Sequence, residues 1–229
     1  MNSFNQMPEY TVTSEIYGEY DYSTGRKASK DGNVISEFPF LLPKGKNTAQ
    51  FDEDNDLDVE RPQKEVIKIE HSSKTNISLV GLQVWRGALL LGDLLIHLGQ
   101  TGTLNGKNIL ELGAGTGLTS FVAAMYAKKV VCTVIYDDDV TAAFISTIQK
   151  ILNTNPPKTI YIVLEKRYVF TIEHMDSVAP CYETFLLLLD KVKVHSNWVV
   201  EQMPTDFPKY FTYDRVKDLV LWKISSKES

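Results

Sequence analysis

The sequence predicts an α/β fold, in which buried strands alternate with helices around one core. Three observations support this prediction. A short apolar strand at residues 109–112 leads into a glycine-rich turn and then into a helical pattern. A long apolar helix precedes that strand, and further strands and helices follow it. The chain has 229 residues, 43% of them hydrophobic and 23% charged. Those values are close to globular averages and predict one domain, with or without an extension.

Residues 1–63 predict a largely disordered, acidic N-terminal extension, with room for one docked strand around the apolar run 38–43. Its aspartates at positions 52, 54 and 56 suggest a calcium loop. An EF-hand loop needs Gly at its sixth place and Glu at its twelfth, and Leu57 and Gln63 stand there. A solvated linker is therefore favoured. The histidines and cysteines show no ligand spacing, so we expect no metal site.

Residues 64–229 are expected to form the folded domain. A strand is predicted at 66–71, followed by an apolar helix at 81–98 whose polar side chains favour a core helix over a membrane span. Further helices are predicted at 118–127, 140–152 and 177–192, and strands at 130–136, 159–165, 198–202 and 219–224.

The charge and the cysteine content restrict the kinds of partner and the cellular location that we expect. The net charge is −5, so the chain lacks the basic field expected for direct nucleic-acid binding or for docking on an anionic membrane. Two cysteines cannot form a disulfide framework, which favours an intracellular location. The first residues show neither a basic segment nor an apolar one, so we expect no secretory signal.

The segment 108–117 reads Asn-Ile-Leu-Glu-Leu-Gly-Ala-Gly-Thr-Gly. Gly113 permits a tight reversal, Gly115 lets the backbone approach a ligand, and Gly117 lets the next helix start close to the sheet. Leu118 occupies the place of the third glycine of a dinucleotide loop, and no P-loop lysine follows. Glu111 suits a ligand that carries an ammonium and a sulfonium. A tight turn without a ligand is the alternative.

The segment Glu111–Leu118 resembles the S-adenosylmethionine loop of seven-strand methyltransferases. Residues 81–88 and 136–139 narrow the resemblance to protein-lysine methyltransferases that modify non-histone proteins, over roughly residues 64–229. The resemblance implies a Rossmann-like seven-strand fold, S-adenosyl-L-methionine as cofactor, and a lysine side chain of a nuclear or chaperone-type protein as substrate. It also implies a monomer located in nucleus and cytoplasm.

By the same resemblance, a group of residues holds the cofactor: Trp85, Glu111, Gly113, Ala114, Gly115 and Gly117. Tyr136 lines the lysine channel, and Asp137 attracts the cationic substrate. Simpler roles stay open for some of them. Trp85 lies on an apolar helical face and suits plain core packing. Tyr136 suits an ordinary strand end, and Asp137 suits the start of the helix near Val140.

One part of the family pattern is missing. The family places two further strands and their helices between the glycine loop and Tyr136, at about 30 residues per unit, and only residues 118–135 lie there. The sequence therefore predicts a fold shortened from the end of strand 2 to strand 4, with the join near Thr133. A deleted exon, as in a splice isoform, and a faulty gene model both explain it. We expect strand 130–136 to pair with 108–112, in the fourth strand's place.

The join removes two acidic residues that the family carries, and Val134 and Thr133 stand in their places. One of them accepts hydrogen bonds from the cofactor ribose in the family. Its loss weakens cofactor binding by roughly ten- to several hundredfold, so activity of this form is doubtful. A catalytically inactive isoform that acts as a protein-interaction module is the alternative. A nicotinamide-dependent oxidoreductase is disfavoured by the loop spacing.

Overall fold

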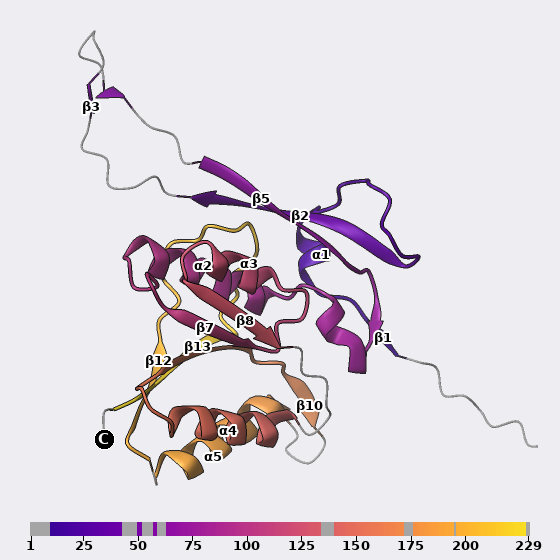
Figure 1. The fold of residues 1–229 in the computed structure, drawn as a ribbon. Helices are drawn as coiled ribbons and strands as arrows, with labels where there is room; N and C mark the ends of the chain where they lie inside the picture. Colours follow the sequence, from indigo (N-terminus) through magenta and orange to yellow (C-terminus); the bar gives the residue numbers. More distant parts are fainter. Residues whose placement is uncertain are drawn as a thin grey trace, which may run out of the picture. The chain divides into compact units, whose positions relative to one another are not determined.

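The computed structural model describes residues 10–42, 50–51, 57–58, 63–133, 140–171, 176–194 and 196–227. The chain divides into two compact units (Figure 1). Unit 1 comprises Met1–Ile135 and Pro208–Asp214, and unit 2 comprises Tyr136–Phe207 and Arg215–Ser229.

Unit 1 carries the N-terminal elements and the glycine loop. Its elements in chain order are β1 Thr11–Val12, α1 Ile16–Glu19, β2 Asn33–Leu42, β3 Gln50–Phe51, β4 Leu57–Asp58, β5 Gln63–Ser72, β6 Thr75–Asn76, the 3₁₀ helix η1 Ile77–Leu82, α2 Arg86–Gln100, β7 Asn108–Leu112, α3 Leu118–Ala124 and β8 Lys129–Thr133.

Strands β7 and β8 pair in parallel, with Ile109 opposite Val130 and Glu111 opposite Cys132. The connection between them runs through α3, as a parallel pair requires, and α3 lies beside α2 (Figure 1). The predicted pairing of strand 130–136 with residues 108–112 is confirmed for residues 130–133, and its assignment to the fourth strand's place stays a prediction. Residues 134–136 of the predicted strand lie outside the described residues.

The N-terminal part contains more structure than one docked strand. β2 and β5 pair antiparallel over ten residues each, from Asn33 opposite Ser72 to Leu42 opposite Gln63. Phe38 and Phe40 alternate along the buried face of β2. Ile16 of α1 is fully buried. Residues 10–42 therefore contribute to the core of unit 1, where the sequence predicted a largely disordered extension.

Helix α2 begins at Arg86, five residues later than the sequence predicted for its start at Gly81. Trp85 has extended backbone angles, φ −121° and ψ 157°. The segment Ile77–Gln100 is long and apolar enough to cross a membrane by length and composition, and 50% of its most apolar window is buried in the protein. Leu89, Leu90 and Ile96 are completely buried, which fits the predicted core helix.

Asp93 anchors the returning segment 208–214 on α2. Its side chain is completely buried. Oδ1 accepts hydrogen bonds from the backbone N–H groups of Tyr210 (2.7 Å) and Phe211 (2.9 Å), and Oδ2 accepts one from the Tyr213 hydroxyl (2.8 Å). These donors satisfy a buried carboxylate that would otherwise be costly.

Unit 2 contains α4 Val140–Leu152, β9 Thr159–Glu165, β10 Val169–Thr171, β11 Asp176–Val178, α5 Pro180–Lys193, β12 Trp198–Met203 and β13 Leu219–Ser226. β13 lies between β12 and β9 and is antiparallel to both. The helix at 140–152 and the strands at 159–165, 198–202 and 219–224 are confirmed. α5 begins at Pro180, with the proline in its first turn, where it needs no N–H partner.

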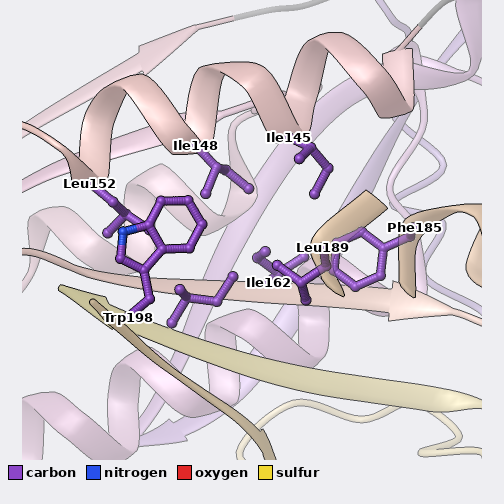
Figure 2. Packing of buried hydrophobic residues seen from close by; sticks show 8 residues of the cluster. Ile145, Ile148, Leu152, Ile162, Phe185, Leu189 and Trp198 are labelled. Atoms are coloured by element: carbon purple, nitrogen blue, oxygen red, sulfur yellow. The ribbon is translucent and has the colours of Figure 1, made fainter. Parts of the chain in front are cut away.

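The core of unit 2 is packed between the helices and the sheet. Figure 2 shows Ile145, Ile148 and Leu152 of α4 facing Phe185 and Leu189 of α5, with Ile162 and Trp198 from the strands. The described strands pair as several small sheets, among them β7–β8 within unit 1 and β12–β13–β9 within unit 2. The single shortened sheet that the sequence predicted stays a prediction.

Candidate functional site

The glycine loop adopts a backbone that only glycine takes readily. Gly113, Gly115 and Gly117 have φ of +73°, +54° and +80°, in the left-handed region. The Gly117 N–H donates to the Ala114 carbonyl at 2.8 Å and closes the turn. Gly117 is also the N-cap of α3. The predicted order of strand, glycine turn and helix is therefore present.

Of the three glycines in the loop, Gly115 lies closest to another segment of the chain. A Cβ built there would lie 2.8 Å from the carbonyl oxygen of Gly81, a distance that real Cβ atoms do not show. Any side chain at position 115 would push the loop away from the segment that leads to Trp85. The approach explains why this position is glycine.

Gly113 and Gly117 border open space. A Cβ at either position would meet nothing within 4 Å. The backbone at these two positions is therefore open on one side, next to the start of α3. A loop of this kind gives backbone N–H groups room to contact a polar ligand.

Glu111 lies in β7, just before the loop, and is partly buried. The Ser120 hydroxyl of α3 donates a hydrogen bond to its Oε2. Burial raises the pKa of the Glu111 carboxyl, and the hydrogen bonds from Ser120 and Thr119 act in the opposite direction. A partly desolvated carboxylate gains more than an exposed one from a cationic ligand.

Trp85 lies in the extended segment before α2, so its predicted position on a helical face is wrong. Its indole Nε1–H donates to the Val80 carbonyl at 2.8 Å. The ring is partly exposed, and the bond fixes its orientation beside the segment that Gly115 approaches. The sequence left two roles open for Trp85, cofactor contact and core packing. Because the ring is partly exposed, it is not completely buried in the core.

The end of β8 carries no carboxylate. Cys132, opposite Glu111, is exposed, and the strand ends at Thr133. The predicted catalytic residues Tyr136 and Asp137 lie outside the described residues. The structure therefore brings together the cofactor-binding candidates around residues 80–85 and 111–117. In the part of the chain that it describes, no group of three His, Cys, Asp or Glu side chains could hold a metal ion.

Sequence analysis did not identify two contacts of the site, those made by Ser120 and by Gly81. Ser120, which bonds Glu111, belongs to a helix whose rotation sequence periodicity fixes only coarsely. Gly81, which receives Gly115, is far from the loop along the chain. A hollow elsewhere, in unit 2, is lined mainly by polar groups of the 152–157 and 196–198 segments. It contains none of the candidate residues and no group suited to the chemistry considered below.

Comparison with known proteins indicates the class of protein to which this chain is similar. Residues 62–133 match the family described as lysine methyltransferase. The matched region contains Trp85 and the whole glycine loop. The family match and the two relatives below support the methyltransferase family for this chain, as the resemblance of the loop predicted.

Two curated relatives share one name. The chain is 29% identical to methyltransferase-like protein 22 of Mus musculus, over 77% of this chain and 64% of the mouse protein. It is 26% identical to methyltransferase-like protein 22 of Homo sapiens, over 88% of this chain and 78% of the human protein. The chain thus spans somewhat less than two thirds of the mouse protein's length.

Proposed function

We propose that this chain is an S-adenosylmethionine-dependent protein-lysine N-methyltransferase domain of the methyltransferase-like protein 22 type, shortened between its second and fourth strands. The observation that carries the proposal is the loop from Glu111 to Gly117, with three left-handed glycines, of which Gly115 lies against Gly81. The substrate is a lysine side chain of a non-histone protein. The protein acts as a monomer in nucleus and cytoplasm, without direct contact with nucleic acid or membrane.

The residues present fit one half of the cofactor. The open space beside the backbone of Gly113 and Gly117 leaves room for its amino-acid end, and the partly buried Glu111 carboxylate pairs with its ammonium. Ala114 contributes backbone at the centre of the loop, and the Trp85 ring is hydrogen-bonded to Val80, next to the Gly81 carbonyl that Gly115 approaches. In the described part of β8, Cys132 is exposed and neither it nor Thr133 carries a carboxylate for the ribose. Among the described residues, the fit is therefore incomplete at the adenosine half.

When bound, S-adenosylmethionine supplies a methyl group attached to a positively charged sulfur. The chain's own residues then have to position a lysine amine in its neutral form and shield it from water. Positioning of this kind contributes up to about 7–11 kcal/mol in well-oriented reactions. In this proposal Tyr136 lines the lysine channel, and Asp137 attracts the cationic side chain on approach.

The comparisons support a missing internal segment. The family match ends at Thr133, the residue at which the sequence predicts the join. The alignments with the mouse and human proteins extend over 253 and 319 positions, more than the 229 residues of this chain. They therefore include positions at which this chain has no residue.

Ligand-observed NMR with S-adenosylhomocysteine tests the function, because it detects weak complexes. We expect saturable binding that Gly115→Ala abolishes, because the added Cβ meets the Gly81 oxygen at 2.8 Å. The matched control is Gly106→Ala, which has the same backbone strain (φ +70°) with nothing within 4 Å of the new Cβ. It should bind like the unaltered chain. Tighter binding of NADH than of S-adenosylhomocysteine would overturn the proposal.

A second candidate function is a catalytically inactive protein-interaction module. It is favoured by the absence of a carboxylate in β8, Lys129–Thr133, and by the pairing of β12, β13 and β9 in one sheet. A methylation assay with tritiated cofactor on a nuclear extract separates the two. Labelled proteins that disappear with Glu111→Gln would refute the inactive module, and their absence would refute turnover by this form.

A further inference from the structure

The segment Gln83–Arg86, which carries Trp85, is held by the N-terminal part of the chain. Gln83 is buried. Its Oε1 accepts from the Ser14 backbone N–H (2.8 Å), and its Nε2 donates to the Val12 carbonyl (3.0 Å) and to the Thr75 hydroxyl (2.7 Å). A single amide side chain thus ties three segments together, and its polar atoms are satisfied without solvent.

Tyr17 forms the second attachment. Its hydroxyl accepts a hydrogen bond from the Val84 N–H at 3.1 Å, next to Trp85 in the chain. Its ring stacks on buried His71, with centroids 4.7 Å apart and planes at 6°. His71 is itself bonded to Ser36 at 2.7 Å. Tyr17 therefore connects the rigid β2–β5 pair to the segment beside the glycine loop.

Arg86, the first residue of α2, forms the third attachment. Its Nε–H donates to Glu19 Oε1 at 3.0 Å, and a second guanidinium nitrogen pairs with the same carboxylate. Both side chains are largely shielded, at 12% and 15% exposed. Glu15 lies 3.9 Å from the same guanidinium and is more exposed, at 42%.

We propose that residues 12–19 are a positioning strap that fixes the backbone of Gln83–Arg86, and through it Trp85 and the seat of the glycine loop at Gly81. This role rests on the proposed function. The strap contacts the segment at three points. These are the buried side chain of Gln83, the backbone N–H of Val84 and Arg86, the first residue of α2. Because a one-ångström displacement at a binding loop is costly, cofactor affinity depends on residues remote in sequence from the loop.

Tyr17→Phe tests the strap with a minimal change. It removes the hydroxyl and leaves the ring on His71. The Val84 N–H loses its acceptor, and the 3.3 Å hydrogen bond between the hydroxyl and His71 Nδ1 is lost with it. The matched control is Tyr20→Phe, also near the N-terminus, whose hydroxyl donates to Asp214 at 2.9 Å and not to the segment. Glu19→Gln is the second test variant, and Glu201→Gln, from the exposed pair with Lys223, is its control.

Amide hydrogen exchange of the full chain is the first measurement. We expect the Val84 amide to exchange about tenfold faster in Tyr17→Phe, the effect of losing roughly one hydrogen bond. Amides of β7 and β13 should be unchanged, as should the whole pattern in Tyr20→Phe. A uniform acceleration across the molecule would reduce Tyr17 to general stability and overturn the proposal, as would no change at Val84.

Affinity for S-adenosylhomocysteine is the second measurement. We expect both test variants to bind about five- to tenfold more weakly than the unaltered chain and the controls to bind equally. Equal affinity of test variants and controls would overturn the strap's link to the cofactor. No binding by the unaltered chain would overturn the proposed function instead, and the exchange pattern would still decide whether the strap exists.

Discussion

At Glu111, burial and hydrogen bonding act on one carboxyl in opposite directions, and burial is the larger influence. The folded state therefore holds the proton more firmly than the unfolded chain does. As pH rises above the ordinary value of 4.5, ionisation costs the folded state more, so this group's contribution to the free energy of unfolding falls. Below that value the carboxyl is protonated in both states and the cost is absent.

Glu111→Gln removes this titration and keeps an acceptor for Ser120. We expect the free energy of unfolding of the variant, relative to the unaltered chain, to increase as pH rises above 4.5. Urea titrations at several pH values measure the difference. A difference that stays constant with pH, or decreases, would show that the carboxyl is not desolvated in the folded protein.

The order of residues around the loop could be predicted at this scale, because glycine spacing and flanking apolar runs are local. The approach of Gly115 to Gly81 could not, because it depends on how two remote segments pack. The role of Ser120 could not be predicted from the sequence for a similar reason. Its hydrogen bond to Glu111 depends on the exact rotation of α3, and the periodicity of a helix of only seven residues does not fix that rotation.

At the scale of elements, strongly patterned segments were the most predictable. Helix α4 and strand β9 have the predicted bounds because apolar periodicity and flanking prolines mark them. The start of α2 was misplaced because residues 81–85 continue its apolar pattern. The structure instead uses Gln83 to bind β1, β6 and residue 14, which requires an extended backbone. Tertiary hydrogen bonds there override a local helical preference.

Helix α5 offers a matched test of the core of unit 2. Leu189 is 2% exposed and belongs to the buried cluster, whereas Leu187, two residues earlier, is 57% exposed. We expect Leu189→Ala to lower the free energy of unfolding by about 2–5 kcal/mol, because it leaves a cavity among packed side chains. Leu187→Ala should cost less than about 1 kcal/mol. Equal losses in urea unfolding would contradict the packing shown in Figure 2.

At the scale of the molecule, the resemblance of the loop predicted the methyltransferase class that the comparisons support, the internal gap near Thr133 stays a prediction, and the sequence underestimated the N-terminal part. Residues 10–42 contain few long apolar runs, so their composition suggests disorder. They fold because Ile16, Phe38 and Phe40 become buried, and Phe40 packs on Phe211, far along the chain. Amino-acid composition does not reveal burial against segments that are distant in the sequence.

The central claim is that the loop at Glu111–Gly117 seats a methyl donor whose adenosine pocket is missing. The most direct test is calorimetric titration of S-adenosylhomocysteine into two proteins, the 229-residue chain and a chain carrying the corresponding segment of the mouse relative after Thr133. The account predicts binding roughly ten- to several hundredfold tighter in the second protein, because the ribose regains its carboxylate partner. Equal affinity in both proteins, or none in either, would contradict it.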